Sequence, residues 1–258
     1  MSTLSIEKPF VIWTLQRSGG TNLANYLDSV SANEKLQDEA FNRVREYGYL
    51  TKNWKDTKDS EALMKGMQEV CALNRNVKHC VERVPWAVSN ALLESSVGAG
   101  FNHLFLYRQD PVKRLLSMEY AERTRSWGPK RVLPKGQDAE AFVEPLNTAQ
   151  LIEHEENANI KLNKAWSKLG KLDANRVAIS YEELYAEDAS VARKALKRVL
   201  KRLAGAIDDP QITAAMKAIR SKGNQKTSDR YAAFKGIDEL SAQASNLPQL
   251  VFRRDIAS

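Results

Sequence analysis

The chain has 258 residues and a net charge of +7, with 39 Lys and Arg against 32 Asp and Glu. Forty-three per cent of the residues are hydrophobic, which is ordinary for a globular protein and excludes collagen, coiled coil and whole-chain disorder. We expect one domain over residues 1–258. No apolar run approaches the roughly 20 residues of a membrane span, and no secretory leader pattern is visible, so we expect a cytoplasmic protein.

The excess of positive charge suggests an anionic partner. At this level nucleic acid, a membrane surface and a polyphosphorylated small molecule all fit. The two cysteines, Cys71 and Cys80, and the three histidines follow no metal-ligand spacing. We therefore expect reduced, structural cysteines and no metal site.

The N-terminal part begins with an apolar run over 9–15, rich in residues that favour strands. Because both of its faces are apolar, it predicts a central parallel strand covered by helices on both sides. A glycine-containing turn follows, and apolar residues at helical spacing then predict a helix over 22–30. Residues 31–76 are polar and mixed, which indicates helices and loops. A further helix is expected over 83–96, ending near Gly98.

A second apolar strand is expected over 101–107. After it, Asp110 and Pro111 suit the N-cap and first turn of a helix that runs to about Trp127. Turn-forming residues over 128–146 predict a flexible loop. The remaining predicted elements are a helix over 148–172, a strand over 176–180, and helices over 190–206 and 209–220. This alternation predicts a three-layer α/β sandwich with a mainly parallel central sheet, in which ligands bind beyond the carboxyl ends of the strands.

The turn after the first strand is Arg17-Ser18-Gly19-Gly20-Thr21. A glycine-rich turn that starts a helix offers an anion backbone N–H groups and the positive end of the helix dipole. The hydroxyl groups and the arginine fork add further donors. The sequence contains no Gly-Lys-Ser/Thr and no Gly-x-Gly-x-x-Gly, so neither a Walker A loop nor a nicotinamide fingerprint is present.

Three motifs, in order along the chain, resemble those of sulfotransferases that use 3′-phosphoadenosine 5′-phosphosulfate (PAPS). Gln16 to Thr21 resembles the family's 5′-phosphosulfate loop, and Arg108 followed by Ser117 resembles its 3′-phosphate motif. Val177 to Leu184 resembles its strand ending in Tyr-Glu-Asp-Leu. The Arg-to-Ser spacing of nine residues is most similar to the bacterial glycan- and lipid-sulfating branch.

The resemblance implies a P-loop-like sulfotransferase fold, with PAPS as co-substrate and no metal. It also implies that Arg17 stabilises the leaving group. The implied donor-binding residues are Arg17, Ser18, Gly19, Gly20, Thr21, Asn22, Arg108, Ser117, Tyr181, Lys222 and Gly223. Lys226 is an alternative to Lys222 for the basic residue that closes on the 3′-phosphate.

The general base implied by the resemblance is Glu39, in a short acidic segment after the first helix. Arg83 stands where the cytosolic branch has a histidine, and an arginine cannot act as a base at neutral pH. Glu82 and His79 are therefore alternatives. The acceptor is a hydroxyl or an amine on a small molecule, a glycan or a lipid, and the insertions near 38–76 and 128–146 are expected to wall its pocket.

Two other classes of function remain as alternatives. One is a P-loop nucleotide kinase or NTPase with a degenerate loop. The other is a non-catalytic basic module, in which a helix face docks on an anionic membrane or a polyanion. That face consists of Arg193, Lys194, Lys197, Arg198, Lys201 and Arg202. Interspersed acidic residues argue against a nucleic-acid partner.

Overall fold

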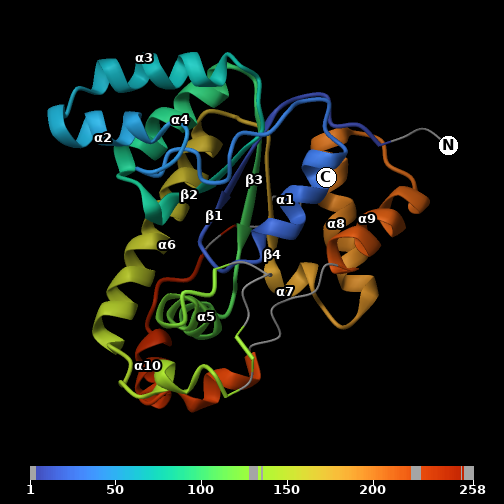
Figure 1. The fold of residues 1–258 in the computed structure, drawn as a ribbon. Coiled ribbons are helices and arrows are strands. Elements are labelled where there is room, and N and C mark those ends of the chain that lie inside the picture. Colours follow the sequence, from blue (N-terminus) through green and yellow to red (C-terminus); the bar gives the residue numbers. More distant parts are fainter. Residues whose placement is uncertain (1–3, 128–132, 135, 222–227, 251, 253–258) are drawn as a thin grey trace.

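The computed structural model describes residues 4–127, 133–134, 136–221, 228–250 and 252. Within them lies a four-stranded parallel sheet in the order β2-β1-β3-β4 (Figure 1). The strands are β1 (Phe10–Thr14), β2 (Val77–Cys80), β3 (Asn102–Tyr107) and β4 (Arg176–Ser180). The predicted α/β class and the parallel sheet are confirmed.

The strand β2 was not predicted from the sequence. Its four residues are Val-Lys-His-Cys, so two of them are polar and the run is too short for a clear period. Pairing with β1, which brings Thr14 opposite Cys80, makes this segment a strand. His79 is buried there between the rings of Trp13 and Phe41.

Helices cover both faces of the sheet, as the apolar first strand predicts. Alternate side chains of β1 point to opposite faces: Trp13 joins one core cluster and Ile12 the other. The first cluster includes residues of α3 (Ser60–Cys71), α4 (Trp86–Gly98) and α6 (Thr148–Lys171). The second includes residues of α1 (Gly20–Ser29), α8 (Ala189–Ala204) and α9 (Asp209–Ser221). These are the three layers of the fold.

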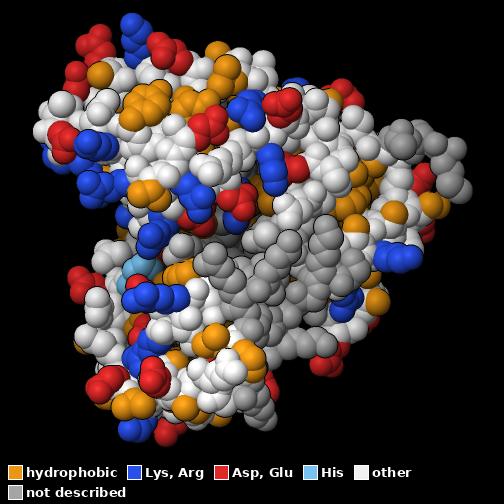
Figure 2. All heavy atoms as spheres, in the orientation of Figure 1, with side chains coloured by type: hydrophobic (Ala, Val, Ile, Leu, Met, Phe, Trp, Pro, Cys, Tyr) orange, Lys and Arg blue, Asp and Glu red, His pale blue; other side chains and the backbone are white. Residues whose placement is uncertain are grey.

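A third core cluster involves α5 (Pro111–Arg123), which follows β3. It also contains residues of the 3-10 helix η3 (Ser228–Ala233) and of α10 (Ile237–Ala244). In Figure 1 these elements lie at the bottom, and α2 (Gly48–Thr57) and α3 lie at the top. Figure 2 shows this face hollowed between the two parts, with Lys and Arg side chains on both sides of the hollow.

Short elements complete the chain: η1 (Val81–Arg83), η2 (Ala139–Phe142) and α7 (Tyr181–Leu184). The predicted helix over 83–96 therefore begins later, at Trp86, because η1 comes first and Pro85 takes the N-cap position. The predicted loop over 128–146 contains η2 and lies partly outside the described residues. No described helix combines the length and apolar character that crossing a membrane requires.

The basic face of α8 is partly occupied by contacts within the chain. Arg198 donates to the carbonyl of Ala178 and to Glu183. Arg193 donates to Thr213, and both Arg193 and Lys197 pair with Asp209. Half of the six charges thus hold neighbouring elements together. Lys194, Lys201 and Arg202 are exposed.

Candidate functional site at the carboxyl edge of the sheet

The glycine-rich turn leads directly from β1 into α1. Gly19 is the N-cap of α1 and has φ = 77°, in the left-handed region that favours glycine. No side chain caps this helix and its first turn holds no acidic residue. The helices α5 and α7, by contrast, are capped by Asp110 and Ser180. The start of α1 thus has neither a capping side chain on its N-cap residue nor a carboxylate in its first turn, which suits an anion.

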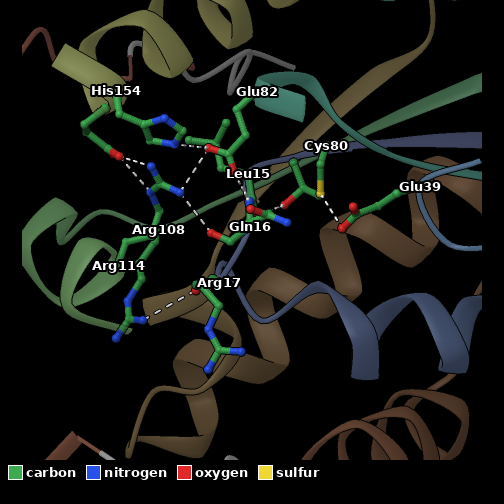
Figure 3. Close-up of polar contacts among 11 residues, drawn as sticks. Leu15, Gln16, Arg17, Glu39, Cys80, Glu82, Arg108, Arg114 and His154 are labelled. Atoms are coloured by element: carbon green, nitrogen blue, oxygen red, sulfur yellow. Dashed lines mark hydrogen bonds and ion pairs between the residues drawn. The ribbon is translucent and has the colours of Figure 1, made fainter. Parts of the chain in front are cut away.

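The arginines and the serine of the first two motifs meet beside this turn. Arg17 donates from Nε to Oγ of Ser117 at 2.9 Å, across 100 positions of sequence. Arg108 approaches from the end of β3, and its Nη1 lies 3.5 Å from the carbonyl oxygen of Arg17 (Figure 3). Burial lowers the pKa of Arg17, although the hydroxyl of Tyr231 opposes this, and the charge of Arg108 lowers the pKa further. Two cations that act on one another at one turn favour binding of an anion there.

Two buried donors at this place have no hydrogen-bond partner among the described residues. They are Oγ of Ser18, whose residue is 1% exposed, and Nε of Arg108. The nearest carboxylate to that Nε is Glu182, at 3.9 Å. A buried donor without an acceptor costs free energy, so the pair fits a site that receives oxygen atoms of an anionic ligand.

The third motif closes the site from β4. The ring of Tyr181 lies 4.6 Å from the Arg108 guanidinium, in cation–π geometry, and packs against Gly19. Glu182 accepts hydrogen bonds from the backbone of Gln109 and Asp110, which ties the third motif to the second. Tyr181 therefore lies beside Gly19 of the first motif and Arg108 of the second.

Tyr185 is a site residue that the sequence analysis missed. Its ring packs against that of Tyr181 in a tilted arrangement, with ring centroids 4.7 Å apart, and its hydroxyl lies 3.5 Å from the carbonyl oxygen of Gly19. Burial raises the pKa of Tyr185 to about 12, while a hydrogen bond with Asn22 opposes the shift. The signal was available: Tyr181 and Tyr185 are four positions apart, so they share a face of the short helix.

The other predicted donor-binding residues differ in exposure, and some lie outside the described residues. Gly20 begins α1 and Asn22 is half-buried beside Tyr185, whereas Thr21 is exposed. Lys222 and Gly223, with the alternative Lys226, lie outside the described residues.

Lys78 is a second residue of the site that the sequence analysis missed. Its Cε would lie 3.4 Å from a Cβ added at Gly20, so its stem runs beside the start of α1. Its ammonium group pairs with Asp38 at 3.6 Å. Burial alone would lower the pKa of Lys78, but Cys80, Asp38 and Glu39 outweigh it and raise that pKa. Because β2 was not predicted, the sequence offered no reason to place Lys78 at this edge.

Glu39 lies beside β2, where its backbone N–H donates to the carbonyl of Lys78 at 3.2 Å. Its Oε2 accepts from Nδ2 of Asn42 at 2.6 Å, and its Oε1 from the thiol of Cys80 at 3.2 Å (Figure 3). Burial, and then the charge of Glu39, raise the pKa of Cys80 well above its usual value. The thiol therefore stays protonated and can serve as a donor that orients the carboxylate.

Arg17 and Glu39 also share an unusual backbone conformation. Six non-glycine residues among those described have positive φ, and these two have 64° and 57°. The other four, Lys58, Asn74, Arg125 and Asp173, lie within three residues of a helix C-terminus. Left-handed residues are common there. Arg17 and Glu39 have no such explanation, and strained backbone of this kind concentrates at functional sites.

The two alternative bases are occupied or inaccessible. His79 is 1% exposed and its Nε2 bonds with Ser89, and burial, followed by the charge of Lys161, lowers the pKa of His79 to about 3. The side chain of Glu82 is buried and forms an ion pair with Arg114. Burial would raise the pKa of Glu82, but Arg114 and His154 outweigh it and hold it below the usual value. Of the three candidates, Glu39 is a half-buried residue, whereas the side chain of Glu82 is 2% exposed and His79 is 1% exposed.

Among the described residues, no three His, Cys, Asp or Glu side chains are grouped as a metal site would need. A scan against protein-family models gave no match, and a search of curated proteins found no similar sequence.

Proposed function

We propose that the chain is a PAPS-dependent sulfotransferase with a P-loop-like fold. The observation that carries the proposal is the meeting of Arg17, Arg108 and Ser117 at an uncapped helix N-terminus. PAPS carries a 5′-phosphosulfate and a 3′-phosphate on one nucleoside, so it requires two neighbouring anion sites. Oγ of Ser18 and Nε of Arg108, which have no hydrogen-bond partner among the described residues, fit that requirement.

The proposed roles follow from where each side chain lies. Bound PAPS supplies an activated sulfuryl group. Gly19, Gly20 and the start of α1 bind the 5′ anion through backbone N–H groups, while Arg108 and Ser117 bind the 3′-phosphate. Arg17 stabilises the charge that develops on the phosphate oxygen as its bond to sulfur breaks.

Glu39 takes the proton of the acceptor hydroxyl or amine while the acceptor's oxygen or nitrogen forms its bond to sulfur. The products are then the sulfated acceptor, adenosine 3′,5′-bisphosphate and a protonated carboxyl group. The contacts of Glu39 with Cys80 and Asn42 hold the carboxylate in place for this step.

Isothermal titration calorimetry with adenosine 3′,5′-bisphosphate tests the proposal. We expect micromolar or tighter binding without metal, and at least a tenfold loss of affinity in Arg108→Ala. Lys113→Ala is the matched control, because Lys113 lies on α5 but is 64% exposed and pairs only with Asp110 among described residues. Absence of binding to the wild type, or a preference for ATP that depends on Mg²⁺, overturns the proposal. A screen with labelled PAPS against small alcohols, phenols, glycans and lipids then identifies the acceptor.

A further inference from the structure

The backbone of Gln16, which directly precedes the glycine-rich turn, is held by an ion pair whose two members come from two other elements. The backbone N–H of Gln16 donates to Oε1 of Glu82 at 2.6 Å, and its carbonyl accepts from Nη1 of Arg114 at 3.0 Å. Glu82 belongs to η1 and Arg114 to α5, and the same Nη1 bonds to Oε2 of Glu82 at 3.2 Å. The backbone N–H and C=O of Gln16, the residue before Arg17, are therefore both held by side chains (Figure 3).

The pair is fully buried and its geometry is heavily constrained. Arg114 is 0% exposed, and its Nε donates to Glu155 of α6 at 2.8 Å. The side chain of Glu82 is 2% exposed and also contacts Nε2 of His154 at 3.3 Å. A buried ion pair contributes little net stability compared with apolar side chains of the same size, although breaking one is costly. Net stability therefore does not account for buried charges from η1, α5 and α6 meeting beside the Gln16 backbone.

The explanation lies in the next residue. Arg17 has φ = 64°, a conformation that is unfavourable for a non-glycine residue and persists only where the surroundings hold it. Ser117, one turn after Arg114 on the same face of α5, holds the Arg17 side chain. The helix α5 thus holds Arg17 at two points: Arg114 binds the carbonyl of the preceding residue, and Ser117 binds the Arg17 guanidinium.

We infer that Arg114 and Glu82 are positioning residues, which hold the Gln16–Arg17 peptide so that the Arg17 guanidinium faces the anion site. This inference rests on the proposed function for the identity of the anion. The effect on the turn itself does not depend on any ligand. The pair thereby converts a strained conformation of Arg17 into a preorganised one.

The test uses Arg114→Lys, with Arg123→Lys as the matched control. Arg123 is on the same helix and binds one carboxylate and several carbonyls, but none of them in the turn. The first readout is hydrogen exchange of the N–H groups of residues 16–18 in the ligand-free protein. We expect exchange at least tenfold faster in Arg114→Lys and unchanged in Arg123→Lys, and equal rates in the wild type and Arg114→Lys overturn the inference.

The second readout is a double-mutant cycle with Arg17→Ala, in binding of adenosine 3′,5′-bisphosphate. We expect Arg17→Ala to cost at least threefold less affinity in the Arg114→Lys background than in the wild type. Equal costs in both backgrounds overturn the inference. If the wild type does not bind this probe, the proposed function fails and the exchange experiment alone decides the positioning role. Should Arg114→Lys not fold, Glu82→Gln replaces it, because an amide oxygen still accepts from Gln16 N–H while the charge is lost.

Discussion

Replacement of Gly19 by alanine is predicted to disrupt the site through the third motif. A Cβ at Gly19 would lie 2.6 Å from Cδ2 and 2.9 Å from Cε2 of Tyr181, and 3.2 Å from Cε2 of Tyr185. Real Cβ atoms do not approach other atoms within 3.0 Å, so Tyr181 has to move. Tyr181 supports Arg108 by a cation–π contact at 4.6 Å, so its movement also disturbs the cation that we assign to the 3′-phosphate.

The magnitude follows from two contributions. An alanine in the left-handed region costs about 1–2 kcal/mol, and pushing an aromatic side chain off its rotamer costs about 0.5–1.5 kcal/mol. We therefore expect Gly19→Ala to lower the free energy of unfolding by about 2–3 kcal/mol, or roughly 5–10 °C in Tm.

Gly20→Ala is the internal control, and urea unfolding followed by circular dichroism is the assay. Gly20 is the first residue of α1, and a Cβ there would lie 3.3 Å from Cδ2 of Leu106, 3.4 Å from Cε of Lys78 and 3.9 Å from Cγ2 of Thr14. The free energy of unfolding of Gly20→Ala should stay within about 1 kcal/mol of the wild type. Alanine lowers the conformational entropy of the unfolded chain, and this stabilising effect offsets the cost of the tight contact. Equal loss of stability in both variants, or no loss in Gly19→Ala, would refute the reasoning.

Three further predictions concern the base, the basic helix and the buried histidines. Glu39→Gln should lower kcat by about 10²–10⁴-fold in the labelled-PAPS assay and leave the Kd for adenosine 3′,5′-bisphosphate unchanged. Glu34→Gln, at a carboxylate whose side chain is 84% exposed, should retain activity, and an equal loss in both variants would remove Glu39 as the base. Arg198→Ala should lower the free energy of unfolding by about 1–2 kcal/mol because it loses the bonds to Ala178 and Glu183, whereas the exposed Lys194→Ala should change it by less than about 0.5 kcal/mol. Similar values for the two in denaturant titrations would contradict the internal role of Arg198. Finally, burial lowers the pKa of both His79 and His103 to about 3. The unfolded chain therefore binds more protons below its usual histidine pKa, so stability is full above that value and falls as the pH drops toward 3, by about 3 kcal/mol at pH 5.5. His103→Asn should roughly halve that loss in unfolding titrations between pH 7.5 and 5.5, and an unaltered loss would show that His103 does not cause it.

The local sequence determined most of the architecture. The apolar runs of β1 and β3, together with the alternation of strands and helices, indicated a parallel sheet between layers of helices. Asp110 with Pro111 set the start of α5, because an N-cap oxygen and a proline each act within one helical turn. The two glycines after β1 marked the turn for the same local reason. Residues whose roles depend on near neighbours in the chain were therefore predictable.

Only the tertiary structure decided which distant side chains share the site. β2 is a strand because β1 is there to pair with it, and so the position of Lys78 could not be derived from the four residues Val77–Cys80. Arg114 looked like one of many charges on a helix, yet packing buries it against the Gln16 peptide and two carboxylates. The reason is physical: periodicity and capping act over a few residues, whereas the meeting of Arg17 with Ser117 spans 100 positions and is set by how the layers pack.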